Sequence, residues 1–170
     1  MEHLAHQLGF ISTFGKNPIM LLLGFSLVIL FLIKLEHYKT GVVAALTSIG
    51  YFYSYYLKQL FGVPRPIAAN PAYYLSFDLF SFPSSHVLFY TTFWGFVIYI
   101  TFKYIKEANL LLHVVRWVAV YMVVSIGASR IFLGVHRIQD VIAGYLFGLF
   151  FLGLLVWLDK KLENVLPKYK

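Results

Sequence analysis

The sequence predicts an all-α integral membrane protein with about five transmembrane helices and a further N-terminal helix at the membrane surface. Of its 170 residues, 60% are hydrophobic and only 12% are charged, and the mean hydropathy is +0.75. Soluble domains are roughly 45–50% apolar, so this composition exceeds theirs. The apolar runs are long and continuous, unlike the short alternating segments of a β-barrel, and helices satisfy their own backbone in lipid. We expect one membrane-embedded domain, residues 1–170.

Five apolar runs are each near the ~20 residues that a helix needs to cross a bilayer. We predict these spans at residues 18–33, 41–60, 85–102, 111–128 and 138–158. Residues 1–16 have apolar side chains near helical spacing and no signal-peptide pattern, which favours an interfacial helix; a frayed terminus is the alternative. The longest connection, residues 61–83, is rich in proline and aromatic residues, and loops of this length are usually functional.

Basic residues are distributed unequally between the two ends of the predicted helices. One end carries Lys34, Lys39, Lys103, Lys106, Lys160, Lys161, Lys168 and Lys170, and the other carries Lys16, Lys58, Arg65, Arg130 and Arg137. The positive-inside rule places the second end outside the cytoplasm. The net charge of +7 is explained by lysines on the cytoplasmic side, where they meet anionic lipid headgroups. It therefore gives no reason to expect binding to nucleic acid. The chain has no cysteine, which excludes disulfides and thiolate metal sites.

Residues 129–140 concentrate ionisable side chains between two apolar runs. Ionisable groups at the edge of a membrane span are costly, which makes them candidates for function. His136 and Asp140 are four residues apart, so on a helix they share a face and the carboxylate can fix the imidazole tautomer. Arg130 is a permanent cation whose planar guanidinium suits phosphate oxygens. Taken alone, the stretch fits an oxyanion site about as well as an interfacial loop with snorkelling arginines.

Two further clusters lie at the same end of the predicted helices. Lys58 is close to the end of the second apolar run, and Arg65 lies between two prolines that restrict its backbone. Ser84 is a good N-cap for the third helix, whose first turn presents the N–H groups of Ser85 and His86 to an anion. A single interfacial histidine is more often structural than catalytic. Three such clusters at one end of the molecule favour a phosphate site.

The three clusters resemble, in order and internal spacing, the three-part signature of the type 2 phosphatidic acid phosphatase superfamily. The parts are Lys58-x6-Arg65-Pro66, Pro83-Ser84-Ser85-His86 and Ser129-Arg130-x5-His136-x3-Asp140. The resemblance covers residues 58–140 directly. The chain departs from the family pattern in two respects: Ser85 stands where the family usually has glycine, and five spans are predicted where the family commonly has six.

The resemblance implies a role for each matching residue. His136 would be the nucleophile that forms a phosphohistidine, Asp140 would orient it, and His86 would protonate the leaving oxygen. The phosphate oxygens would be held by Lys58, Arg65, Ser84 and Arg130, with the backbone N–H groups of Ser85 and His86. Fixed cations and N–H groups can supply the charge stabilisation that phosphoryl transfer needs, so we expect no metal ion and no cofactor.

The reaction implied by the resemblance is hydrolysis of a phosphomonoester or pyrophosphate on a membrane lipid, at the outer face of the bacterial cytoplasmic membrane. Bacterial substrates of the family include lipid A 1-phosphate, phosphatidylglycerophosphate and undecaprenyl pyrophosphate. The expected partners are the lipid and the bilayer, with no nucleic acid and no obligatory protein partner. One alternative is a transporter or flippase of anionic lipids, which needs binding charges but no nucleophilic histidine. Another is a vanadate-dependent haloperoxidase, a soluble class that shares these motifs.

Overall fold

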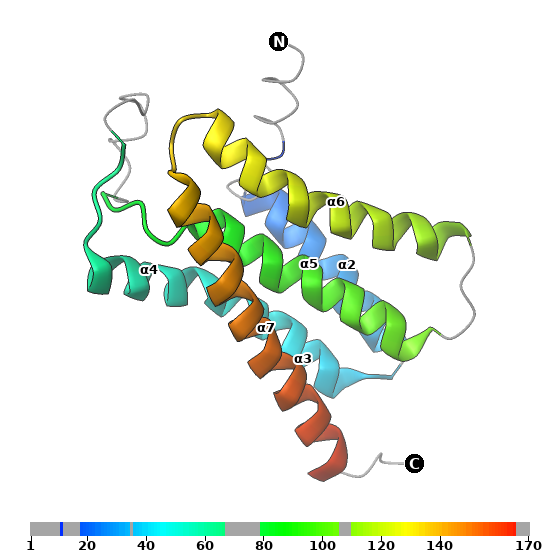
Figure 1. The fold of residues 1–170 in the computed structure, drawn as a ribbon. Coiled ribbons are helices and arrows are strands. Elements are labelled where there is room, and N and C mark those ends of the chain that lie inside the picture. Colours follow the sequence, from blue (N-terminus) through cyan, green and yellow to red (C-terminus); the bar gives the residue numbers. More distant parts are fainter. Residues whose placement is uncertain (1–10, 12–17, 35, 67–78, 106–109, 166–170) are drawn as a thin grey trace.

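The computed structural model describes residues 11, 18–34, 36–66, 79–105 and 110–165, and these residues are predominantly helical (Figure 1). The helices are α2 (Pro18–Lys34), α3 (Tyr38–Leu46), α4 (Gly50–Phe61), α5 (Ser85–Tyr104), α6 (Leu110–Phe132) and α7 (Ile138–Val165), with the 3₁₀ turn η1 (Thr47–Ile49) between α3 and α4. The predicted all-α membrane architecture is confirmed. The interfacial helix expected at residues 1–16 lies outside the described residues, except for Ile11, which is helical.

Three helices among the described residues, α5, α6 and α7, are long and apolar enough to cross a bilayer. Helix α2 contains a shorter apolar stretch, Leu22–Lys34. The second predicted span is broken by η1 into α3 and α4. At this break the hydroxyls of Thr47 and Ser48 donate to carbonyls three residues earlier, at 2.6 and 2.7 Å. Such side-chain bonds compete with the α-helical pattern and favour a tighter turn.

Helix α5 forms the centre of the fold, with α7, α6 and α4 packed around it (Figure 1). In its most apolar stretch 67% of the residues are buried, against 28% in α6 and in α7. Phe89 of α5 stacks on Tyr51 of α4 with ring centroids 4.6 Å apart, and Phe93 contacts Phe25 of α2 at 4.8 Å. Many large apolar side chains of α2, α6 and α7 remain exposed, as expected for surfaces that meet lipid.

Two glycines allow α7 to lie directly against α5. A β-carbon at Gly144 would stand 3.0 Å from the carbonyl oxygen of Ser84, and one at Gly148 would stand 2.9 Å from that of Leu88. Backbone atoms of a packed helix cannot move away easily, so these positions favour glycine. The spacing of four residues repeats the contact one turn later, as in closely packed membrane helices. This approach brings the first turn of α7 to the start of α5.

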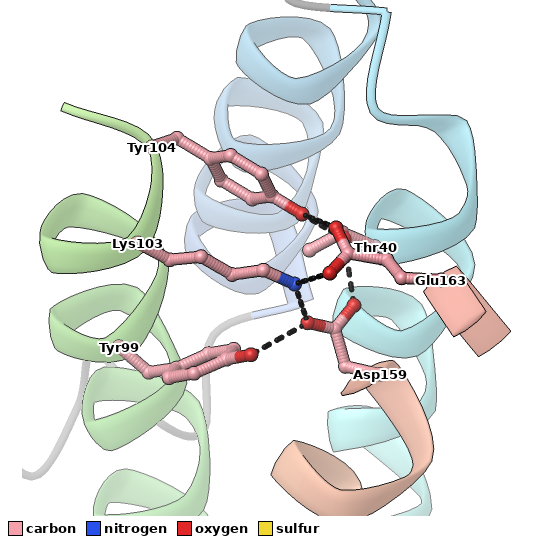
Figure 2. A network of polar contacts seen from close by, with 6 residues as sticks. All are labelled: Thr40, Tyr99, Lys103, Tyr104, Asp159 and Glu163. Carbon is pink, nitrogen blue, oxygen red and sulfur yellow. Dashed lines mark hydrogen bonds and ion pairs between the residues drawn. The ribbon is translucent and has the colours of Figure 1, made fainter. Parts of the chain in front are cut away.

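A polar network joins α3, α5 and α7 (Figure 2). It includes Lys103 in the last turn of α5 and Asp159 near the C-terminal end of α7, far along α7 from the α6–α7 connection. Asp159 of α7 is fully buried and forms an ion pair with Lys103 of α5. It also accepts hydrogen bonds from the hydroxyls of Thr40, at 2.6 Å, and Tyr99, at 2.8 Å. Lys103 has a second ion pair, with Glu163, at 2.9 Å. A buried carboxylate is costly unless it is paired, so this network favours one arrangement of the three helices.

Candidate active site

The connection between α6 and α7 holds His136 in a buried position beside the first turn of α7. The side chains of His136 and Asp140 are 1% and 2% exposed, and Nδ1 of His136 lies 3.4 Å from Oδ2 of Asp140. The same carboxylate oxygen accepts a hydrogen bond from the N–H of Arg137 at 2.9 Å. Arg137 directly precedes the helix and Asp140 is its third residue, as in the carboxylate half of a capping box. The expected contact is therefore present, although His136 precedes the helix.

Three cations from three separate elements lie close to His136. Lys58, in the last turn of α4, is 2% exposed, and its Nζ donates to the carbonyl oxygen of Phe80 at 2.6 Å. Arg65, in the connection after α4, is 8% exposed. Its guanidinium donates at 3.2 Å to the carbonyl oxygen of Val135, the residue before His136. Arg130, in the last turn of α6, is 1% exposed. The fold thus gathers side chains that are far apart in the sequence.

This environment keeps the imidazole of His136 neutral. The pKa of His136 is lowered from 6.5 to about 4. Burial is the largest cause and the charges of Arg130, Lys58 and Arg65 act in the same direction, whereas the hydrogen bond with Asp140 opposes them. At neutral pH the imidazole is therefore unprotonated. With Nδ1 donating to the carboxylate, Nε2 carries the lone pair.

The start of α5 lies against the first turn of α7, because the N–H of Ser84 donates to the carbonyl oxygen of Asp140 at 3.0 Å. Ser84 has the extended backbone of an N-cap, as predicted, but its hydroxyl forms no capping hydrogen bond. Its Oγ is buried and has no hydrogen-bond partner among the described residues. A buried hydroxyl in this state lowers stability, and such groups occur at binding sites. The hydroxyl is available to a ligand that enters the site.

Ser85 and His86 occupy the first turn of α5, as predicted from the sequence. The N–H groups of a first turn have no acceptor within their own helix and lie at the positive end of its dipole. His86 is 8% exposed, and the contact between Ser84 and Asp140 brings its turn to the same end of the molecule as His136. Ser85 is only partly buried, so a serine side chain is accommodated where the family usually has glycine.

The backbone contacts between the segment after α4 and the segment before α5 were not predicted from the sequence. Ser81 is fully buried, and its N–H donates to the carbonyl oxygen of Val63 at 2.8 Å. Beside this bond, Pro64 and Phe80 form an isolated antiparallel bridge. These contacts join the two described ends of the 61–83 connection. Backbone carbonyls carry no residue-specific signal, so the acceptors of Lys58 and Arg65 were not predictable from the sequence.

The described part of this site combines three cations with one carboxylate. An excess of positive charge in a buried position suits an anion with more than one charge, and guanidinium groups bind phosphate oxygens in two-pronged contacts. Among residues 11, 18–34, 36–66, 79–105 and 110–165, no three His, Asp or Glu side chains gather closely enough to hold a metal ion. Activity without a metal stays a prediction.

The fold and the site define an integral membrane protein with a buried cluster of cations around a histidine at one end of its helices. The chain belongs to the PAP2 superfamily, because the family model matches residues 38–163. The resemblance inferred from the three clusters is thereby confirmed.

A curated protein and a solved structure, both from Bacillus subtilis, show this similarity in detail. Phosphatidylglycerophosphatase B of strain 168 is 30% identical over 89 residues, which is 52% of this chain and 44% of that protein. The chain thus matches less than half the length of this curated relative. A crystal structure of a transmembrane PAP2-type phosphatidylglycerolphosphate phosphatase has a TM-score of 0.77 at 24% identity, and the match covers 98% of this chain and 81% of the other. The structural likeness shows a shared fold.

Proposed function

We propose that the protein is a metal-independent phosphatase that hydrolyses a phosphomonoester or a pyrophosphate on a membrane lipid. The observation that carries this proposal is the buried, neutral His136, with Asp140 at Nδ1 and three cations nearby. A neutral imidazole can attack phosphorus, and fixed cations offset the negative charge of the phosphate. Membership of the PAP2 superfamily supports the proposal, as do the names of the curated relative and of the structural neighbour, both phosphatases of phosphatidylglycerophosphate.

In the first step, Nε2 of His136 attacks the phosphorus atom. The P–N bond forms while the P–O bond to the lipid breaks, and protonated His86 gives its proton to the leaving oxygen. Asp140 holds the Nδ1–H of the phosphohistidine and stabilises its positive charge. The lipid leaves as an alcohol, or as a monophosphate if the substrate is a pyrophosphate.

In the second step, water attacks the phosphorus atom of the phosphohistidine. His86, now neutral, takes a proton from the water while the P–N bond breaks. Inorganic phosphate leaves, and both histidines return to their starting states. In both steps the phosphoryl oxygens are held by the three cations, the hydroxyl of Ser84 and the N–H groups of Ser85 and His86. Most of the catalysis is therefore positioning and charge stabilisation.

Three lipids are the substrates to test: phosphatidylglycerophosphate, lipid A 1-phosphate and undecaprenyl pyrophosphate. The first is favoured by the names of both relatives. We place the reaction at the outer face of the bacterial cytoplasmic membrane, because the lysine-rich end of the helices is expected to face the cytoplasm.

The test uses the purified full-length protein with each lipid in the presence of a chelator. We expect phosphate release from at least one lipid, and acid-labile protein-bound phosphate after a rapid alkaline quench. His136→Ala should abolish both signals. His113→Ala is the matched control, since this histidine is exposed on α6, and it should retain both. No release from any lipid, release that requires added Mg²⁺, or equal release by His136→Ala would overturn the proposal; lipid transfer without hydrolysis would favour a transporter.

The role of His86 has its own test, based on the leaving group. A lipid alkoxide needs a proton to leave, whereas an activated phenolate does not. His86→Ala should therefore lose far more activity on a lipid than on an aryl phosphate. An equal loss on both substrates, or phosphate trapped on His86, would show that the roles of the two histidines are assigned wrongly.

A further inference from the structure

Ser81 is fully buried in the segment before α5, where neighbouring backbone groups contact two other parts of the site. The carbonyl oxygen of Phe80 accepts a hydrogen bond from Nζ of Lys58 at 2.6 Å. Three residues after Ser81, the N–H of Ser84 donates to the carbonyl oxygen of Asp140 at 3.0 Å. Ser81 is thus held between a contact to α4 and a contact to α7. The two steps of phosphoryl transfer make no use of its hydroxyl.

The hydroxyl of Ser81 has one proton and three oxygen acceptors close to it. Its Oγ lies 3.2 Å from the carbonyl oxygen of Pro64 and 3.4 Å from that of Val63. Both distances exceed the roughly 2.5–3.0 Å of a normal O–H···O hydrogen bond. The third acceptor is the carboxylate of Asp140, which forms a hydrogen bond with the side chain of Ser81. Hydrogen bonds to an ionised acceptor are stronger than those to a neutral one, so the proton belongs to the carboxylate.

The carboxylate of Asp140 depends on such donors, because its side chain is only 2% exposed. Its Oδ2 accepts a hydrogen bond from the N–H of Arg137 at 2.9 Å and lies 3.4 Å from Nδ1 of His136. The second distance is at the long end for a hydrogen bond, so a small movement of the carboxylate would break the contact with the ring. Arg137 and Ser81 donate to this carboxylate from two different segments. Together they fix its position relative to the imidazole.

We propose that Ser81 is a positioning residue of the phosphatase. Its hydroxyl holds the carboxylate of Asp140 where that carboxylate keeps Nδ1 of His136 as the donor and Nε2 free to attack phosphorus. This inference rests on the proposed phosphatase function and adds a residue to it that does not touch the phosphate. The competing role is structural: the hydroxyl would serve the carbonyl oxygen of Pro64 and so hold the neighbouring Arg65. The two roles affect different kinetic constants.

The first test is Ser81→Ala, which removes the hydroxyl and keeps the backbone N–H. Its kcat should fall about ten- to hundredfold on a lipid and on an aryl phosphate, the cost of a small misplacement of a reacting group. KM and the inhibition constant of inorganic phosphate should stay within about twofold of wild type, because the phosphate-binding cations are unchanged. Ser81→Thr keeps the hydroxyl and should restore kcat. Ser125→Ala is the matched control, since this buried serine donates to a backbone carbonyl within α6, and it should equal wild type.

The pH profile separates positioning from a general loss of structure. A carboxylate with one donor fewer accepts more strongly from the imidazole and favours its protonated form, so the pKa of His136 should rise in Ser81→Ala. The acid limb of kcat/KM should then move to higher pH, whereas that of Ser125→Ala should stay in place. The charged groups that act on the ring are otherwise the same in these proteins: Lys58, Arg65, Arg130 and Asp140.

Support would be a lower kcat at constant KM in Ser81→Ala, a displaced acid limb, and recovery in Ser81→Thr. A rise in KM and in the phosphate inhibition constant at unchanged kcat would assign the hydroxyl to the Arg65 segment and overturn the proposal. If either variant fails to accumulate in the membrane, Ser81→Cys keeps the shape of serine with a weaker donor, and its kcat should fall at unchanged KM; an unchanged kcat or a raised KM there would count against the proposal. An active wild type with Ser81→Ala equal to it rejects the positioning role alone, whereas an inactive wild type rejects the phosphatase and this role with it.

Discussion

At the scale of single residues, the surroundings of His136 determine its chemistry. A histidine in water titrates near pH 6.5, so it is partly protonated at neutral pH. Burial and three neighbouring cations lower the pKa of His136 to about 4, and the carboxylate of Asp140 fixes the orientation of the ring at Nδ1. Burial is the larger cause, and the same cations that would bind phosphate add to the lowering of this pKa. One set of charges therefore serves two purposes.

Removal of one of these cations should shift the pH dependence of activity. Lys58→Met takes away a positive charge that lowers the pKa of His136, so the pKa should rise toward 6.5. The acid limb of kcat/KM, which reports the free enzyme, should then move to higher pH on the same substrate. Lys161→Met, at the opposite end of the molecule, should leave the limb in place. An acid limb that does not move in Lys58→Met would show that this lysine does not act on His136.

A second prediction concerns the shape of a cation rather than its charge. Arg130→Lys keeps the charge but loses the planar fork that suits two phosphate oxygens, so kcat/KM should fall roughly a hundredfold. Arg116→Lys is the matched control on the same helix, because Arg116 donates to the carbonyl oxygen of Thr101 near the other end. Full activity in Arg130→Lys would mean that the phosphate contact is not bidentate. Thermal melting in detergent should be similar for both variants.

At the scale of elements, the close approach of α5 and α7 aligns the two halves of the site. Ser84 and His86 belong to the start of α5, whereas Asp140 belongs to the first turn of α7. The backbone hydrogen bond between Ser84 and Asp140 can form only if the two helices nearly touch. Gly144, one turn after Asp140, is the position at which any side chain would separate them.

Gly144→Ala tests this alignment. A β-carbon there would meet the Cβ of Val87 at 2.8 Å and the carbonyl oxygen of Ser84 at 3.0 Å, so one helix must shift. Overpacking of this kind costs about 1–3 kcal/mol, and we expect a lower Tm together with reduced kcat. Gly153→Ala is the control on the same helix, since nothing lies within 4 Å of its β-carbon. That change should be neutral or stabilising by up to about 1 kcal/mol. Equal melting temperatures for the two variants would contradict the predicted role of Gly144.

At the scale of the whole molecule, the two ends have different kinds of polar structure. One end has the buried cations around His136, whereas the other has the network of Lys103, Asp159 and Glu163, in which opposite charges are paired (Figure 2). Helix α5 connects the two ends through the most buried part of the protein. This division agrees with a membrane protein that performs its chemistry on one side of the bilayer. Orientation in the membrane stays a prediction from the lysine distribution.

Cysteine labelling can test that orientation, because the natural chain has no cysteine. We expect an impermeant thiol reagent applied to intact cells to label Leu79→Cys, which is 63% exposed next to the site. Lys161→Cys, at the far end of α7, should react only after the cells are permeabilised. The reverse pattern would place the site in the cytoplasm and contradict the positive-inside reasoning.

The sequence by itself determined the membrane class, the approximate spans and the residues of the three clusters. Hydrophobic length is a local property of the chain, so α5, α6 and α7 could be located without knowledge of their contacts. The clusters were visible because ionisable side chains are rare in a chain of this composition. The spacing of His136 and Asp140 predicted their contact, since both belong to one short stretch of backbone.

Only the tertiary structure decided how the clusters meet and in what state His136 is held. The lowered pKa depends on burial and on cations from α4, α6 and the connection after α4, which come together only in the folded protein. The same is true of the carbonyl acceptors of Lys58 and Arg65 and of the missing capping bond of Ser84. Each of these features depends on contacts between residues distant in the sequence. The residue pattern of a single segment predicts only the local structure of that segment.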